Sequence, residues 1–179
     1  MAAEFISSPQ TPAGHHEKIL MRSVDLCTFA FACYAQPGVE AALLQLQAEG
    51  ADVCLLLCGA WLEARKTGYR PQRLAQLEEL GERWQREVVK PLRILRQAWK
   101  EPSREDRELD ALRTQVKELE LAAETILLRR LEALSQGWSA EDQPATWLEA
   151  MSEGMQAGEA ARATLRRATA AIQLELTGA

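Results

Sequence analysis

The sequence predicts an all-α protein, a multi-helix bundle of six or seven helices in a single domain. Alanine, leucine, glutamate, arginine and glutamine dominate the composition, whereas the residues that favour strands are scarce. Apolar residues recur three and four positions apart through most of the chain, which is the period of an amphipathic helix. Glycine and proline fall between these periodic segments, where helices end. A length of 179 residues suits one domain.

Three regions follow from the composition. Residues 1–22 are expected to form a flexible N-terminal leader, because they contain two prolines and few large apolar side chains. Residues 23–101 are expected to form a helical core, and residues 102–179 to add long helices that pack on it. The first twenty residues lack a basic start followed by an apolar run, so no signal peptide is predicted. Four cysteines then indicate reduced thiols and a cytoplasmic protein.

A central buried helix is predicted near residues 52–66. The stretch ADVCLLLCGAW has no charge after Asp52, which is a natural N-cap. Ten uncharged residues are about half the length that crosses a bilayer, so burial in a helical core is favoured over a membrane span. Two shorter helices should precede it. The first is capped by Ser23 or Asp25, and the second starts at Pro37 and ends at Gly50.

An amphipathic helical segment is expected after Pro71, with Pro102 as its end. Pro91 interrupts it, because proline removes a backbone hydrogen bond, so we expect two parts that meet at a kink near residues 89–91. The apolar face consists of Leu74, Leu77, Leu80, Trp84, Val88, Leu92, Leu95 and Trp99.

A long helix bearing a heptad pattern is expected near residues 104–135. Ser103 and Asp106 resemble a capping box at its start. The heptad stripe either packs within the bundle or takes a partner helix, so it is a candidate partner face. The stripe consists of Leu109, Leu112, Val116, Leu119, Ala123 and Ile126. A last helix should begin near Pro144 and run to Ile172, with Gly154 and Gly158 allowing close approach to a neighbour.

No catalytic constellation is visible. The only histidines, His15 and His16, lie in the leader, and no phosphate-binding loop or nucleophile motif is present. Acidic residues such as Glu118, Glu120 and Glu124 are expected mostly on polar helix sides. Cys54 and Cys58 share a helix face and are weak candidates for metal binding, but core packing explains them better. The sequence therefore predicts a protein without enzymatic activity or cofactor.

The basic residues form a second candidate face. Residues 63–104 carry a net charge of +5, whereas the segments before and after carry −4 and −6. Within this region basic side chains recur every three or four residues, a pattern that can bind phosphates or can simply be a solvated helix face. They are Arg83, Arg86, Lys90, Arg93, Arg96 and Lys100.

Two stretches carry a resemblance to a known family. The first runs from Asp25 to Leu62 and the second is WQREVVKPLRILRQAWK, which ends at Lys100. Over roughly residues 25–100 the sequence resembles the bacterial domain-of-unknown-function 2390 family. The family usually has tryptophan where Cys27 stands and asparagine where Cys54 stands. The resemblance implies a bacterial cytosolic protein and supplies no catalytic residues.

These observations predict a cytoplasmic helical protein that acts by binding another protein or by self-association. Binding of nucleic acid or another polyanion through residues 83–100 is the alternative. A thiol-ligated metal or small-molecule site is a second alternative. No membrane association is expected.

Overall fold

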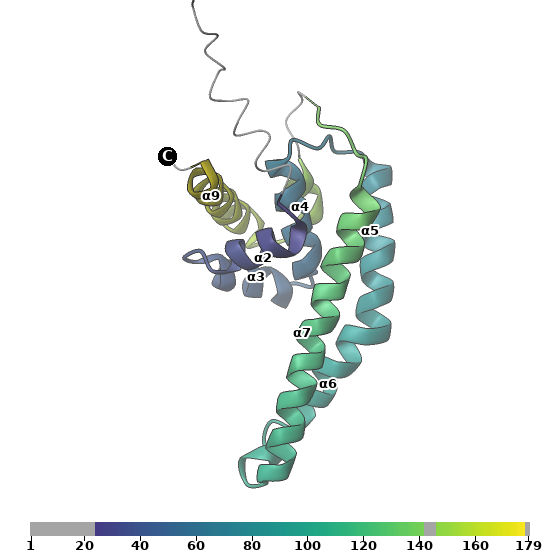
Figure 1. The fold of residues 1–179 in the computed structure, drawn as a ribbon, viewed down its shortest axis with the longest axis vertical. Coiled ribbons are helices and arrows are strands. Elements are labelled where there is room, and N and C mark those ends of the chain that lie inside the picture. Colours follow the sequence, from purple (N-terminus) through teal and green to yellow (C-terminus); the bar gives the residue numbers. More distant parts are fainter. Residues whose placement is uncertain (1–23, 142–145, 178–179) are drawn as a thin grey trace, which may run out of the picture.

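The computed structural model describes residues 24–141 and 146–177. Within them the chain forms helical rods joined by turns, and two stretches of extended backbone meet only at a bridge between Thr67 and Ala140. Figure 1 shows short helices gathered into a core, from which two long rods run side by side. The prediction of an all-α multi-helix bundle is confirmed.

The described helices form seven continuous rods, because α5, η1 and α6 follow one another without a break and count as one. The core contains α2 (Leu26–Tyr34), α3 (Val39–Ala48), α4 (Val53–Ala64), α8 (Trp147–Met151) and α9 (Gly158–Thr177). The first long rod is α5 (Pro71–Trp84), the π-helical turn η1 (Gln85–Val89) and α6 (Lys90–Ala98). The second is α7 (Arg107–Ser135), which follows the short 3₁₀ turn η2 (Pro102–Arg104).

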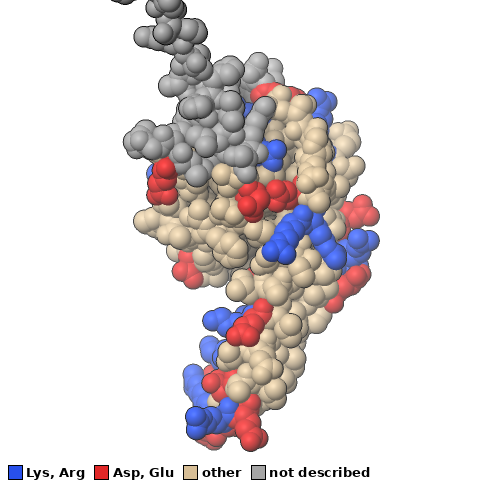
Figure 2. Space-filling model, in the orientation of Figure 1, with Lys and Arg blue, Asp and Glu red and all other residues tan. Residues whose placement is uncertain are grey.

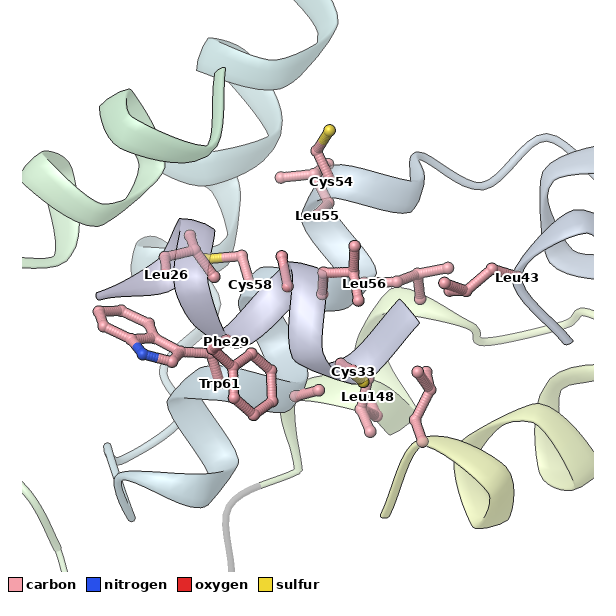
Figure 3. Packing of buried hydrophobic residues seen from close by; sticks show 14 of the residues in the cluster. Leu26, Phe29, Cys33, Leu43, Cys54, Leu55, Leu56, Cys58, Trp61 and Leu148 are labelled. Atoms are coloured by element: carbon pink, nitrogen blue, oxygen red, sulfur yellow. The ribbon is translucent and has the colours of Figure 1, made fainter. Parts of the chain in front are cut away.

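Helix α4 is the centre of the core, as predicted. Every residue from Cys54 to Leu62 is buried, and Figure 3 shows Cys58 and Trp61 among the α2 side chains Leu26 and Phe29. The helix starts where Oδ1 of Asp52 accepts hydrogen bonds from the Cys54 and Leu55 N–H groups. Full burial of each large apolar side chain contributes about 1.5–3 kcal/mol before conformational entropy is subtracted.

Three indole N–H groups connect distant segments. Trp61 donates to the Val24 carbonyl at 3.0 Å, and Trp147 donates to the Thr67 carbonyl at 2.8 Å. Trp84 donates to the Ala123 carbonyl at 2.9 Å, which fixes the two long rods to each other. Each of these rings, buried in Trp61 and Trp147 and partly buried in Trp84, thereby satisfies its polar group while it packs against the interior.

Two helix starts differ from the sequence prediction. Helix α3 begins at Val39 rather than Pro37, because Gly38 takes a left-handed conformation with φ of 81° and ends the preceding turn. Helix α7 begins three residues later than the predicted capping box. Asp106 is its N-cap and accepts from the Glu108 and Leu109 N–H groups at 3.0 Å, whereas the Ser103 hydroxyl donates to the Lys100 carbonyl.

The predicted last helix is in fact two helices. The chain leaves α8 after Met151, turns at Gly154 with φ of 76°, and resumes as α9 at Gly158. A left-handed glycine stops an α-helix, so Gly154 ends the first segment instead of packing inside one long helix. The expected start at Pro144 and the predicted leader, residues 1–22, lie outside the described residues. The division into regions stays a prediction.

The irregularity expected near Pro91 is present as the π turn η1, which ends at Val89. Proline has no N–H to donate to the carbonyl four residues earlier, and a widened turn accommodates this loss. Among the described helices, none combines the length and the apolar character that a bilayer crossing requires.

Candidate functional site

The two long rods extend beyond the core as an arm, which we define as residues 90–126. It consists of α6, η2 and the N-terminal part of α7. No residue of α6 is buried, because α7 is its main neighbour and covers only one side of it. The arm therefore has two candidate binding surfaces, one that faces the core and one that faces away from it.

A groove of about 680 Å³ lies between the core and the arm. Residues of α2, α3 and α4 line one wall, and residues of α6 and α7 line the other. Phe31, Leu44 and Leu121 are each about half exposed there, so the groove is open to solvent. The apolar part of the lining consists of Ala30, Phe31, Tyr34, Ala35, Leu44, Val53, Cys54, Leu57, Leu121 and Leu128.

A cluster of four charged side chains joins α6 to α7 at the edge of the groove. The Arg93 Nε donates to Glu120 Oε1 at 2.8 Å, and its Nη2 donates to Glu124 Oε1 at 2.8 Å. The Arg96 Nε donates to Glu120 Oε2 at 2.5 Å. Arg113 adds a hydrogen bond from its Nε to the Arg96 carbonyl at 3.2 Å. The cluster balances two positive and two negative charges, so it holds the hairpin closed.

The cluster changes the acidity of its carboxyl groups in opposite directions. Burial by itself raises the pKa of Glu120, but hydrogen bonds from Arg96 and Arg93 outweigh it and lower the pKa below its usual value. Burial raises the pKa of Glu124, and the charge of Arg93 offsets this only in part. Glu120 is thus a stable anion that neutralises two guanidinium groups, rather than a proton donor or acceptor.

Asp52 lies beside this cluster and has one oxygen without a partner. Oδ1 caps α4, whereas Oδ2 is enclosed and has no hydrogen-bond partner. Burial raises the pKa of Asp52, opposed by the Leu55 and Cys54 N–H groups, the Gln85 side chain and the charge of Arg93. An unpaired buried acceptor costs free energy, so Asp52 caps its helix at some expense of stability.

Glu120 was expected on a polar helix side, and this expectation is wrong. The residue is 6% exposed. Its burial depends on α6 packing against that side of α7, with Arg93 and Arg96 opposite. The sequence contained a signal, since a pair of arginines three apart and a pair of glutamates four apart match each other across a helical hairpin.

The six residues of the predicted basic face do not form one surface. Arg93 and Arg96 are half-buried and paired, and Arg86 pairs with Glu87 at 3.0 Å. Arg83, Lys90 and Lys100 are exposed. The π turn between Arg83 and Lys90 also breaks the α-helical period, so basic residues before and after it do not line up on one side of the helix. Figure 2 shows basic and acidic atoms intermingled on the visible side of the arm, with no uniform basic area.

The cysteine thiols lie in the core rather than at a site. Cys54 and Cys58 are both buried, and Figure 3 shows their sulfurs well apart along α4. Burial raises the pKa of both thiols, and it raises the pKa of Cys33 to about 12. In the described part of the chain, no three His, Cys, Asp or Glu side chains come together as a metal site would require.

The predicted heptad stripe of α7 is half covered. Val116 and Ala123 are buried, and Leu109 is half-buried. The alternate members face solvent, with Leu112 49% exposed, Leu119 57% exposed and Ile126 39% exposed. These three follow one another every seven residues, so they form a nearly straight line along the helix.

This line and Leu95 of α6 form what we call the back face of the arm. Glu120 and Leu121 lie about 100° and 200° round the helix from Leu119, so the back face is turned away from the groove. Ten large apolar side chains are exposed in the described residues. Four of them line the groove, and one of these four is Leu121 of the arm. Five others also belong to the arm, namely the four of the back face and Ile94. Exposed apolar area is therefore concentrated at these two surfaces.

Fold and surfaces together define an all-helical protein with a projecting two-helix arm. Residues 25–131 match the family described as proteins of unknown function, DUF2390, and the chain belongs to that family. The match extends past residue 100 and includes the whole arm. No curated protein matches the chain, and no solved structure matches it either.

Proposed function

We propose that this protein is a non-enzymatic binding protein of the bacterial cytoplasm, and that it binds another protein chain through the back face of its arm. The observation that carries the proposal is the half-covered heptad of α7. Leu112, Leu119 and Ile126 continue a helix-packing pattern for which the chain provides no covering helix in its described part. Exposed apolar stripes of this kind mark protein contact sites.

A non-enzymatic role is supported by the state of the polar groups. The enclosed carboxylate of Glu120 is neutralised by two arginines, and the core thiols have a raised pKa, so neither offers a reactive group. Binding of polyanions is less well supported than protein binding, because Arg93 and Arg96 already pair with glutamates of α7.

Site-specific photocrosslinking in the cells that make the protein tests the proposal. A benzoylphenylalanine at position 119 should yield a crosslinked product with a protein chain. The matched control is position 121, because Leu121 is 54% exposed on the same helix but faces the groove. Absence of a product from position 119, or equal products from both positions, would contradict the proposal.

A further inference from the structure

We infer that the groove between the core and the arm binds a small organic cation, an amine whose ammonium group is held among Glu40, Tyr34 and Glu124 and whose apolar body lies along the groove. This site is separate from the back face, so the inference does not depend on the proposed function. It follows from the size of the groove, from its exposed aromatic rings and from the distribution of its charges.

The groove has the size of a small-molecule site. Its volume of about 680 Å³ lies within the range of about 300–1,000 Å³ that is typical of ligand pockets. It occupies the angle between the core helices α2 and α3 and the arm (Figure 1). The α7 part of its lining extends from Lys117 to Leu128, about 16 Å along the helix. The groove is therefore long enough for an aliphatic chain or for a ring with a short chain.

Two aromatic rings of α2 are exposed in the groove. Phe31 is 55% exposed and Tyr34 is 38% exposed, and a spacing of three residues places both on the same side of the helix. The Tyr34 hydroxyl has no hydrogen-bond partner in the part of the chain that the structure describes. The face of an aromatic ring attracts a cation within about 6 Å of its centre. The two rings therefore offer contacts both to an ammonium group and to the apolar body attached to it.

The carboxylates around Glu124 outnumber the basic groups that neutralise them. Arg93 and Arg96 form ion pairs with Glu120 and Glu124, and the charge of Arg93 also acts on Asp52. Three carboxylates thus share two guanidinium groups. Burial and the charges of Glu120 and Asp52 raise the pKa of Glu124, and the charge of Arg93 offsets this only in part. One negative charge beside the groove therefore lacks a compensating cation.

Glu40 adds a second carboxylate from the opposite wall. It is exposed, it lines the groove, and it forms no ion pair with a described residue. Burial and the charges of Glu40 and Glu124 raise the pKa of the Tyr34 hydroxyl, so both carboxylates lie near this phenol. An ammonium group beside Tyr34 is therefore attracted by two carboxylates, one from α3 and one from α7.

Lys117 is the basic residue of the lining that forms no ion pair with a described residue, and it lies away from this position. It precedes Glu124 by seven residues, which is about 10 Å along α7 toward the tip of the arm. Lys117 therefore does not neutralise the carboxylates near Tyr34. The charges favour a cation there over a neutral or an anionic group of the same shape.

Ligand-observed NMR titration at pH 7 tests the sign of the charge with three probes of equal chain length, namely hexylammonium, hexan-1-ol and hexanoate. Hexylammonium should bind with a Kd of about 1 mM, because a ligand with so few atoms has limited affinity. It should bind about tenfold more tightly than either of the other two probes. Equal binding of hexylammonium and hexan-1-ol, tighter binding of hexanoate, or no binding of hexylammonium up to about 20 mM would overturn the inference.

Two lysine substitutions on α7 test the location. Leu121 is 54% exposed and Leu119 is 57% exposed, but only Leu121 lines the groove. Both substitutions change the net charge equally, and the exposure of both positions allows the folded protein to accept a lysine. Leu121→Lys should weaken hexylammonium binding about tenfold, because it places a like charge in the groove, whereas Leu119→Lys should bind like the wild type. Equal effects of the two substitutions would overturn the location.

Glu40→Gln tests the carboxylate of the core wall. It should weaken hexylammonium binding about threefold and leave hexan-1-ol binding unchanged, because it removes a charge and keeps the shape of the side chain. Glu79→Gln is the matched control, since Glu79 is exposed on α5 and does not line the groove. A Glu40→Gln protein that binds hexylammonium like the wild type would remove Glu40 from the site. None of these titrations involves a protein partner, so their failure leaves the proposed function to be decided by the crosslink at position 119.

Discussion

Replacing Glu120 by glutamine tests how the arm is held together. The carboxylate is almost enclosed and accepts hydrogen bonds from the Nε atoms of Arg93 and Arg96, whose side chains are each about a quarter exposed. Without its charge, Arg93 keeps Glu124 as a partner, whereas Arg96 loses the carboxylate with which it forms its ion pair. Breaking a fully buried ion pair costs about 3–5 kcal/mol, and breaking an exposed pair costs about 0–1 kcal/mol. We expect an intermediate loss of about 2 kcal/mol in the free energy of unfolding.

Urea unfolding at neutral pH measures this loss, and thermal unfolding should show a melting temperature lower by about 4–8 °C. Glu118→Gln is the matched control, since Glu118 lies two residues earlier on the same helix and is exposed. It should change the free energy of unfolding by less than about 0.5 kcal/mol. Equal effects of the two substitutions would refute the reasoning.

The pH dependence of the same comparison gives an independent check. Because the folded pKa of Glu120 is lowered, its stabilising effect is fully present above the unfolded pKa of about 4.3 and is lost as the pH falls through the folded value. The difference in the free energy of unfolding between the wild type and Glu120→Gln should therefore be constant near neutral pH and become smaller in acid. An advantage that grows on acidification would contradict the assignment.

Three further predictions concern the core and the helix ends. Burial raises the pKa of Asp52, so ionisation of this carboxyl group lowers the free energy of unfolding as the pH rises through the raised pKa. In urea unfolding at pH 7, Asp52→Asn should therefore have a free energy of unfolding equal to or above that of the wild type. Asp52→Ala should lose about 1 kcal/mol, because it removes the N-cap of α4. A thiol reagent added to the folded protein should modify Cys27 first, whereas Cys33 should react only on unfolding. Asp106→Ala should cost about 1 kcal/mol in the same unfolding assay, and Ser103→Ala should cost less because its hydroxyl caps no helix.

The sequence was sufficient to predict the helices whose ends and faces are encoded locally. Asp52 followed by an uncharged run specified α4, because a cap and a wholly apolar surface both act within the helix itself. The same holds for the body of α7, where the heptad fixed the helix. The covering of that heptad could not be predicted, because burial depends on how many other helices lie beside the stripe.

The candidate site depended on contacts between residues that are far apart in the chain. Arg93 and Glu120 are 27 residues apart, and they meet only because the chain reverses direction at η2. The basic face was extrapolated with a constant α-helical period, which the π turn interrupts. Gly154 illustrates a different limit, because a glycine can continue a helix or end it, and the packing of α8 and α9 decides which.

The π turn η1 also sets the rotational phase of the arm with respect to its base. It accommodates one residue more than an α-helical turn would. If the same residues wound as an ordinary α-helix, every later side chain of α6 would be rotated by about 100° about the axis relative to α5. The two arginines would then swing away from their glutamates and a different side of α6 would meet α7. This short segment therefore determines which surface the arm displays, although it contributes only Val89 to the interior.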